Sequence, residues 1–207
     1  MSLLHRARFF VSAARLDQLP PPGPAEVAFV GRSNAGKSSA INVLAAQRRL
    51  AFSSRTPGRT RLINLFALPD PLDPDGALGY LVDLPGYGYA AVAHDAKSNW
   101  GEVLGRYLRE RSSLAGVVLL IDIRRGVTEH DRRLVDWLAP ANRPVLVLLT
   151  KADKLPYGRR VQAIAAVRKD LQALGQLDVI PFSATQRIGL EDAGHHIERW
   201  VSPQVAP

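Results

Sequence analysis

Apolar runs of strand length alternate with segments of helical periodicity over the second half of the chain. The expected strands lie at 117–123, 145–149 and 179–182, and the expected helices follow them at 131–138, 161–174 and 188–201. Strands that alternate with helices form parallel sheets, because each helix carries the chain back to the start of the next strand. The pattern therefore predicts an α/β fold in which a mostly parallel sheet has helices on both faces.

In the first half of the chain, one strand and helix are followed by a pair of strands with no helix between them. Residues 26–30 form an apolar run that predicts a buried strand, and 38–48 follow as a helix-like segment. Two further runs, 62–68 and 78–82, are separated by residues dense in turn formers, which predicts an antiparallel pair. Phe9-Phe10-Val11 lies in a basic segment that resembles a mitochondrial presequence, but we expect an N-terminal strand there.

The length of 207 residues suits one domain with a sizeable core. We expect residues 25–201 to form this domain, 1–24 to form an extension that packs on it or leads into it, and 202–207 to form a flexible tail. Pro20-Pro21-Pro22-Gly23-Pro24 is a stiff spacer before the first core strand, since proline can continue neither a helix nor a sheet interior.

Several classes of protein are excluded by composition. The chain contains no cysteine, which excludes a disulfide partner, thiol chemistry and a zinc ribbon. No apolar run approaches the roughly 18 residues of a membrane span, so we expect no membrane partner and a cytoplasmic location. The adjacent His195 and His196 lack ligand spacing to other candidates and are expected on a solvated helix face.

The net charge is +8 and the pI is near 10.3, and arginine supplies 22 of the 27 basic residues. Such a surface favours polyanions, and the planar guanidinium group suits phosphate better than an ammonium group does. We therefore expect a nucleic-acid partner. A merely soluble basic surface, or an arginine bias of the genome, is the alternative.

The strand at 26–30 runs into Gly31-Arg32-Ser33-Asn34-Ala35-Gly36-Lys37-Ser38, which fits the phosphate-binding P-loop pattern G-x-x-x-x-G-K-[ST]. Glycines at both ends let the turn direct backbone N–H groups at phosphate oxygens, and the following helix adds its N-terminal dipole. Lys37 is expected to reach the β and γ phosphates, and the Ser38 hydroxyl to bind Mg²⁺. A purely structural turn is the alternative.

Ligands of such sheets bind at the carboxyl ends of the strands, so the loops that follow the strands are informative. Asp83-Leu84-Pro85-Gly86 follows the strand at 78–82. Its aspartate can hold Mg²⁺ through water, and the N–H of Gly86 can approach a γ-phosphate. The alternative is that these residues form an ordinary turn at the end of a strand and bind nothing.

The loop after the strand at 145–149 is Thr150-Lys151-Ala152-Asp153, and its chemistry predicts which base the nucleotide carries. An ionised carboxylate only accepts hydrogen bonds, and guanine offers it N1–H and the 2-amino group, an arrangement of donors that adenine lacks. Asp153 is therefore expected to select guanine, and the stem of Lys151 to lie along the base. Phe182-Ser183-Ala184, after the next strand, is expected to offer a backbone N–H to the guanine O6.

The polar loop at 53–61 is expected to supply a hydroxyl that completes Mg²⁺ coordination when a γ-phosphate is bound. Ordering of such a loop by γ-phosphate and Mg²⁺, with release on hydrolysis, is a general switch mechanism. We assign this hydroxyl to Thr60. Thr56 is the rival, but it precedes proline and lies farther from the strand that starts at Leu62.

With these loops in order, the chain resembles the EngB family of bacterial GTPases, also called YihA or YsxC, over nearly its whole length. The strings that carry the resemblance are the P-loop at 31–38, Thr-Pro-Gly-Arg-Thr at 56–60, Asp-Leu-Pro-Gly-Tyr-Gly-Tyr at 83–89 and Thr-Lys-Ala-Asp at 150–153. The resemblance implies a Ras-like fold with a six-stranded sheet, binding of GTP and Mg²⁺, and hydrolysis to GDP. It also implies a role in assembly of the large ribosomal subunit and in cell division and septation. The departures are Arg61, where glutamine is commoner, and the proline-rich connection at 69–76.

The expected GTP-binding residues come from five loops. They are Gly31, Arg32, Ser33, Asn34, Ala35, Gly36, Lys37, Ser38, Gly58, Arg59, Thr60, Arg61, Leu62, Asp83, Leu84, Pro85, Gly86, Thr150, Lys151, Ala152, Asp153, Phe182, Ser183 and Ala184. Lys37, Asn34 and Thr60 are the expected catalytic residues, and Ser38 and Thr60 are the expected Mg²⁺ ligands.

In Ras-like enzymes a glutamine that orients the attacking water often follows the Asp-x-x-Gly motif, but here Tyr87 occupies that position. We therefore expect slow hydrolysis in isolation, with acceleration from outside the chain. As in other GTPases that are similar at this loop, the amide oxygen of Asn34 is expected to help bind K⁺ beside the phosphates. An asparagine that only stabilises the loop is the alternative.

Two groups of arginines surround the nucleotide-sensitive segments and are expected to contact ribosomal RNA or the large ribosomal subunit. They are Arg55, Arg59 and Arg61 in the first loop, and Arg106, Arg109 and Arg111 on a helix after Tyr87. Arg132, Arg133, Arg159 and Arg160 are expected on solvated helix faces. The alternative function is a P-loop kinase or another ATP-dependent enzyme on a small substrate, which the guanine-selecting loop and the lack of a lid-like insertion disfavour.

Overall fold

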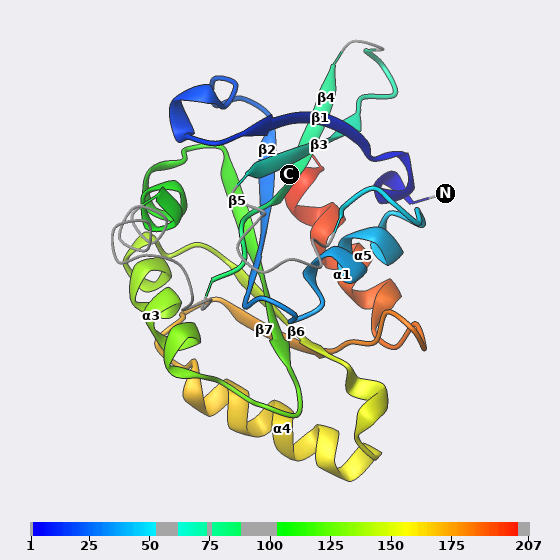
Figure 1. Ribbon diagram of the computed structural model, residues 1–207, viewed down its shortest axis with the longest axis vertical. Helices are drawn as coiled ribbons and strands as arrows, with labels where there is room; N and C mark the ends of the chain where they lie inside the picture. The colour runs from blue at the N-terminus through cyan, green and yellow to red at the C-terminus, as the bar shows by residue number, and fades with distance from the viewer. Residues whose placement is uncertain (1, 53–61, 74–75, 88–102, 203–207) are drawn as a thin grey trace, which may run out of the picture.

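Seven strands form one sheet at the centre of the described chain. The computed structural model describes residues 2–52, 62–73, 76–87 and 103–202, and its strands lie in the order β1-β3-β4-β2-β5-β6-β7. They are β1 (Arg8–Ala13), β2 (Ala25–Gly31), β3 (Ile63–Pro69), β4 (Ala77–Asp83), β5 (Leu114–Asp122), β6 (Val145–Thr150) and β7 (Leu177–Pro181). Strands β4, β2, β5, β6 and β7 run parallel, whereas β3 is antiparallel to both β4 and β1. The predicted mixed, mostly parallel sheet is confirmed (Figure 1).

The strand count is the one feature of the sheet that differs from the implied six. Strand β1 is the seventh, and it extends the sheet by pairing with β3 through a register shift between Phe9 and Val11. The ring of Phe9 meets Phe66 edge-on, and that of Phe10 lies 5.3 Å from Tyr80. The predicted N-terminal strand is therefore confirmed, and its pairing with β3 is what enlarges the sheet.

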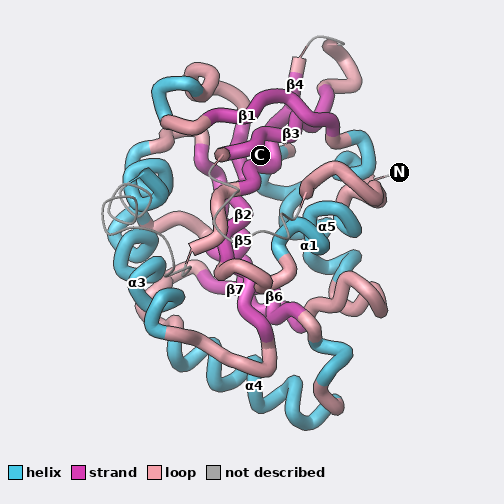
Figure 2. The backbone as a smooth tube through the Cα atoms, viewed as in Figure 1, coloured by secondary structure: helices cyan, strands magenta, loops and turns pink. Residues whose placement is uncertain are grey.

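Helices cover both faces of the sheet (Figures 1 and 2). Helices α1 (Lys37–Leu44) and α5 (Leu190–Val201) pack on one face, and residues 103–110, α3 (Glu129–Leu138) and α4 (Tyr157–Asp170) pack on the other. Short 3-10 turns lie at η1 (Leu3–Arg6), η2 (Leu16–Gln18), η3 (Ala139–Ala141) and η4 (Ala152–Lys154). None of the described helices combines the length and the apolar composition that crossing a membrane requires.

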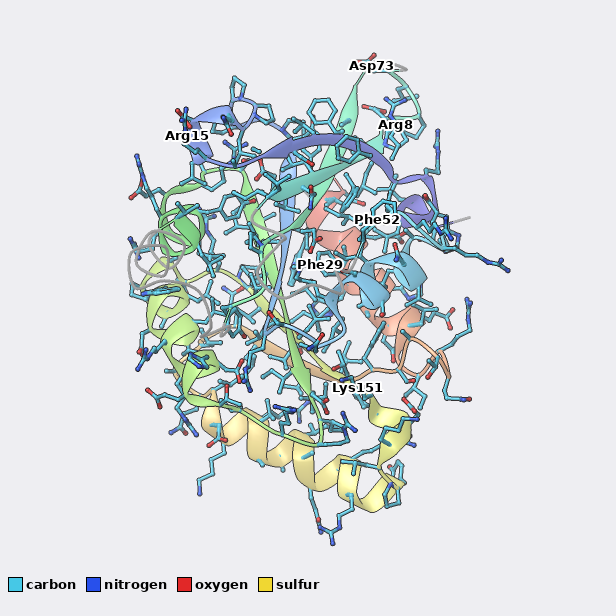
Figure 3. All side chains as sticks on the ribbon, in the orientation of Figure 1. Arg8, Arg15, Phe29, Phe52, Asp73 and Lys151 are labelled. Atoms are coloured by element: carbon cyan, nitrogen blue, oxygen red, sulfur yellow. The ribbon has the colours of Figure 1, made fainter. Side chains whose placement is uncertain are left out.

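Two apolar clusters fill the space between the sheet and its helices. Phe29, Ile41 and Ile197 belong to the cluster under α1 and α5, and Phe29 lies in the middle of the molecule (Figure 3). Strand β5 supplies both clusters, because successive side chains of a strand point to opposite faces: Leu119 enters one cluster and Leu120 the other. The continuous apolar runs of the sequence therefore reflect strands that are covered on both faces.

Two helices, α4 and α1, end four residues before their predicted ranges do, whereas α3 and α5 differ only at their first residues, by two. Helix α4 begins at Tyr157 rather than residue 161, with Pro156 at its N-cap, where the missing N–H of proline costs nothing. It ends at Asp170, and the apolar residues that prolonged the helical pattern, Leu171 and Leu174, are buried in a turn. Helix α1 ends at Leu44, and the left-handed backbone of Ala46 (φ 51°) prevents its continuation to residue 48.

Arg111 does not lie on a surface helix available to RNA, and that prediction is wrong. It follows the helical residues 103–110, and its guanidinium group is buried against Glu26, with Nη2 2.6 Å from Oε1. The same carboxylate accepts hydrogen bonds from the hydroxyls of Tyr107 and Ser113, at 2.6 and 2.8 Å. Glu26 needs these donors, because an unpaired carboxylate that is 1% exposed is very unfavourable. Arg111 therefore stabilises the start of β2.

His196 also differs from its predicted solvated position. Its side chain is 16% exposed, with Nε2 3.2 Å from Asp178 Oδ2 in β7 and its ring edge-on to Trp200. Burial lowers the pKa of His196, and Asp178 opposes this effect. His196 therefore links α5 to β7, whereas the neighbouring His195 is exposed as predicted.

Candidate functional site

The P-loop joins β2 to α1 at the carboxyl end of the parallel sheet. Gly31 ends β2, and a Cβ atom there would lie 3.0 Å from the carbonyl oxygen of Leu120, so the close approach of β2 to β5 requires glycine. Gly36 adopts φ 96° and caps α1, whose first residue is Lys37. The unpaired N–H groups of the first helical turn therefore face the loop, as an anion site at a helix N-terminus requires.

Lys37 forms an ion pair with Asp83 at the end of β4. The Asp83 side chain is 2% exposed and that of Lys37 12%, and Nζ contacts Oδ1 directly. Asp83 lies opposite Phe29 in the register of β2 and β4, which brings the end of β4 beside the P-loop. The carboxylate of Asp83 and the hydroxyl of Ser38 in α1 are hard oxygen donors, so the residues present fit a Mg²⁺ ion.

The segment after Asp83 is bonded to the P-loop through its backbone. The N–H of Tyr87 donates to the carbonyl of Gly31, and the N–H of Ser33 donates to the carbonyl of Tyr87, both at 3.3 Å. Gly86 lies so close that a Cβ atom would approach Ser33 Oγ to 3.1 Å. The 83–87 segment and the phosphate-binding loop are therefore in direct backbone contact.

The side chain of Tyr87 binds α3. Its hydroxyl donates to Asp131 Oδ1 at 2.6 Å, while Asp131 Oδ2 accepts from the N–H and hydroxyl of Thr128 and caps α3. Burial raises the pKa of Tyr87 well above its usual value, and the charge of Asp131 adds to the rise. The phenol is therefore a neutral group held against a buried carboxylate.

Thr150 supports the P-loop from β6. Its hydroxyl donates to the carbonyl of Ala35 at 2.7 Å, with the carbonyl of Ile121 at 3.2 Å. Thr150 is 3% exposed, so this hydroxyl satisfies a buried polar atom of the loop. The first residue of the candidate base loop is thus a structural support of the phosphate loop.

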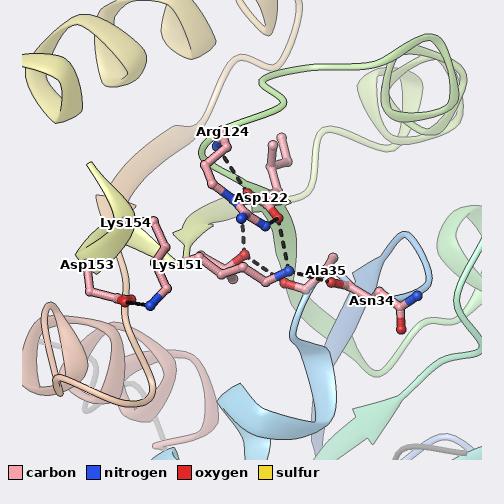
Figure 4. Close-up of polar contacts among 9 residues, drawn as sticks. Asn34, Ala35, Asp122, Arg124, Lys151, Asp153 and Lys154 are labelled. Atoms are coloured by element: carbon pink, nitrogen blue, oxygen red, sulfur yellow. Dashed lines mark hydrogen bonds and ion pairs between the residues drawn. The ribbon is translucent and has the colours of Figure 1, made fainter. Parts of the chain in front are cut away.

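Lys151 joins three loops (Figure 4). Its backbone is left-handed (φ 60°), and its Nζ donates to the carbonyl of Asn34 at 3.0 Å and to Asp122 Oδ2 at 2.9 Å. Sequence analysis did not single out Asp122. A charged residue near the carboxyl end of the apolar strand predicted at 117–123, at the same sheet edge as the other loops, is the signal that could have found it.

Asp153 is oriented by the loop after β7. Its Oδ1 accepts a hydrogen bond from Ser183 Oγ at 2.6 Å, and its Oδ2 lies 3.0 Å from Lys154 Nζ. These hydrogen bonds, that of Ser183 first, lower the pKa of Asp153, which keeps it an acceptor. The N–H groups of Phe182 and Ser183 are engaged by Leu149 and Ile188. Of the three predicted O6 donors, Ala184 is therefore the one without such a bond in the described structure.

A cavity of about 270 Å³ lies beside the P-loop, on the side that faces α3. Asn34, Lys151 and Tyr87 line it, but Lys37 and Asp153 do not, so it flanks the candidate nucleotide site. Arg124 and Arg125 add positive charge to its wall. The carboxylates of Asp122 and Asp131 also line it, so the charge of its wall is mixed.

Of the predicted residues in the first loop, 58–62, the structure describes only Leu62. Leu62 is exposed before β3. The predictions for Gly58, Arg59, Thr60 and Arg61, and for the rival Thr56, fall outside the described residues. The structure thus brings together the P-loop, the 83–87 segment, the base loop and the 182–184 loop.

A family model described as 50S ribosome-binding GTPase matches residues 26–151. A probable GTP-binding protein of Bordetella pertussis, EngB, is 72% identical over 207 residues, covering 100% of both chains. The crystal structure of a probable GTP-binding protein named engB has a TM-score of 0.63 at 20% identity, covering 86% of this chain and 98% of that one. Era, solved with MgGDPNP and part of 16S ribosomal RNA, has a TM-score of 0.67 at 24% identity, covering 88% and 58%.

Proposed function

This chain belongs to the EngB family of GTP-binding proteins and is a GTPase; from that premise we propose that it acts in the cytoplasm as a GTP-dependent switch in assembly of the large ribosomal subunit. We further propose that normal cell division and septation depend on it. The observation that carries the proposal is the family match over residues 26–151, together with a carboxylate, Asp153, oriented at the same sheet edge as the P-loop. Residues 25–201 form the proposed GTPase domain, with 1–24 as its extension and 202–207 as its tail.

The proposed nucleotide site assigns one task to each loop. The N–H groups of the P-loop and the ammonium group of Lys37 bind the phosphates. Asp153 binds the guanine edge, Lys151 lies along the base, and Ala184 meets O6. Ser38 and Thr60 would hold Mg²⁺, with Asp83 nearby, and the ion would supply positive charge that stabilises the phosphates.

Hydrolysis is proposed to be slow in isolation because Tyr87 stands where a water-orienting glutamine is common. Two features support this proposal. The Tyr87 hydroxyl is bound to Asp131, and burial keeps the phenol neutral. Orientation of the attacking water therefore falls to Thr60 and the other residues around the γ-phosphate, or to a partner.

Potassium is proposed to accelerate hydrolysis through Asn34. This residue is exposed, and the contact with Lys151 uses its backbone carbonyl, which leaves the side-chain amide for a cation. Turnover should be faster in KCl than in NaCl at equal ionic strength, by about 10-fold or more, because a cation beside the phosphates stabilises developing charge. Asn34→Ala should abolish the difference between the two salts. Equal rates in the two salts for the wild type would exclude this role.

The proposed partner is ribosomal RNA within the large subunit. Association should require GTP and weaken steeply with salt, because each phosphate contact releases counterions. Both effects can be measured by pelleting the protein with large ribosomal subunits between 50 and 200 mM KCl, in the presence of GDP or a non-hydrolysable GTP analogue. Single-turnover hydrolysis with and without subunits measures whether the subunits activate the GTPase.

Arg106 and Arg109 offer a matched test of that contact. Arg106 is exposed and pairs with Glu110, so its replacement by glutamine removes a surface charge, as does Arg109→Gln. The double variant should bind subunits more weakly and with a shallower salt slope, whereas Arg159→Gln on the distant α4 should not. Binding that is independent of both salt and nucleotide would contradict an RNA contact near the switch segments.

A further inference from the structure

Asp122 lies where three loops of the candidate site meet. It ends β5, opposite Thr150 of β6, and Gly31 of β2 pairs with Leu120 of the same strand. Strand β5 thus runs between the strand that carries the P-loop and the strand that carries the base loop. The side chain of Asp122 is 7% exposed.

Four donors converge on this carboxylate. Arg124 donates from Nε to Oδ1 at 3.0 Å, from Nη2 to Oδ2 at 2.7 Å and from its backbone N–H to Oδ1 at 3.1 Å. Lys151 Nζ donates to Oδ2 at 2.9 Å. Burial alone would raise the pKa of Asp122, but the hydrogen bonds from Arg124 and Lys151 hold it well below its usual range. The carboxylate therefore stays ionised and accepts all four bonds.

The ammonium group of Lys151 is held between two acceptors from different loops. Asp122 binds it from the end of β5, and the carbonyl of Asn34 binds it from the P-loop, as Figure 4 shows. A lysine side chain has four rotatable bonds and is normally mobile. With both its left-handed backbone and its Nζ constrained, the stem of Lys151 has one course across the site.

We propose that Asp122 is a positioning residue for guanine recognition: it holds Lys151 against the P-loop, so that the lysine stem is in place along the base before the nucleotide arrives, and Arg124 holds Asp122 in turn. The proposal rests on the assignment of Lys151 and Asp153 to the guanine site. The physical reason is preorganisation. A side chain that is already ordered in the folded protein loses no further conformational entropy when the ligand binds. Asp122 touches no nucleotide and acts through Lys151.

Asp122→Asn should weaken binding of GDP by roughly 10-fold, the cost of immobilising a long side chain on binding. Arg124→Gln should weaken it by a smaller factor in the same direction, because Asp122 keeps its contact with Lys151. Arg125→Gln is the matched control, since it removes a charge from the same loop while only its backbone N–H contacts Asp122, at the carbonyl. Competition against a fluorescent GDP analogue measures the dissociation constants, and thermal unfolding without nucleotide reports whether each variant is folded.

A double-mutant cycle separates positioning from general support of the fold. In the background of Lys151→Ala, Asp122→Asn should have little further effect on GDP affinity, because the group through which Asp122 acts is gone. Asp122→Asn should lower the affinity for inosine diphosphate, which lacks the 2-amino group, by the same factor as the affinity for GDP, since Asp122 does not touch the base edge. An undiminished loss of GDP affinity in the Lys151→Ala background would overturn the proposal.

Failure of the proposed guanine site is distinguishable from failure of this inference. If Asp153→Asn shifts preference from GDP to xanthosine diphosphate while Asp122→Asn binds GDP as the wild type does, the base site stands and only the positioning role of Asp122 is overturned. If Asp153→Asn keeps the wild-type preference for GDP, the base site is misplaced and the role of Asp122 falls with it.

Discussion

Asp153→Asn should transfer the preference of this GTPase from guanine to xanthine nucleotides. The carboxylate of Asp153 accepts from Ser183 Oγ through Oδ1, and its side chain is 13% exposed, so the two hydrogen bonds to guanine would form in a largely dry environment. An asparagine amide offers a donor where guanine also has a donor, and one where xanthine has a carbonyl. GTP affinity should fall about 10³-fold, as the loss of two hydrogen bonds to a charged group implies, and xanthosine triphosphate should become the better ligand.

Ser183→Ala is the control for this substitution. It removes the hydrogen bond that orients Asp153 Oδ1 but keeps the carboxylate. The variant should bind GTP about 10-fold more weakly, because one orienting bond is lost, while still preferring guanine to xanthine. Dissociation constants for the two triphosphates, measured in both variants by competition, test the assignment. A guanine preference that survives Asp153→Asn would remove Asp153 from its proposed role.

Lys37→Ala should lower the affinity for a non-hydrolysable GTP analogue by about 10²-fold, because it removes a charge-assisted contact with the phosphates. It should also lower the free energy of unfolding without nucleotide by about 3–5 kcal/mol, because Asp83 is 2% exposed and would be left as an unpaired buried charge. The lysine is thus expected to have a structural as well as a binding role. Thermal or urea unfolding and equilibrium binding measure the two effects separately.

A double variant separates these two effects. Lys37→Ala combined with Asp83→Asn removes both charges, so most of the lost free energy of unfolding should return. Nucleotide affinity should not return, since neither substitution restores a cation for the phosphates. If Lys37→Ala alone unfolds as the wild type does, the ion pair contributes nothing to the fold.

The features that the sequence predicts share a local signal. The P-loop is a contiguous string in which the backbone conformation requires glycine. Gly36, for example, adopts the left-handed conformation that its position in the motif requires. The assignment of Asp153 to the guanine edge rests on the hydrogen-bonding pattern of guanine and stays a prediction. The order of strands and helices follows from apolar periodicity, although α4 is displaced because Leu171 and Leu174 continue a helical pattern in a turn.

The residues that were missed or misplaced act through distant partners. Arg111 appeared to be one of several surface arginines, and only the packing of residues 103–113 against β2 shows that it neutralises Glu26. His196 gained a partner from β7 in the same way. Nothing local distinguishes such a residue from a solvated neighbour, because the distinction depends on burial and on which charge lies opposite.

By itself, the sequence determined the fold class, the phosphate loop and the base, because periodicity and motif chemistry are properties of contiguous residues. Only the tertiary structure decided how these parts are connected: Lys37 to Asp83, Tyr87 to Asp131, and Lys151 to Asp122 and the P-loop. These contacts join residues far apart in the chain, and the register of the parallel strands sets them. A buried charge is stable only beside a partner, and the folded sheet decides which residue lies beside it. The spacing of residues along the chain does not predict that neighbour.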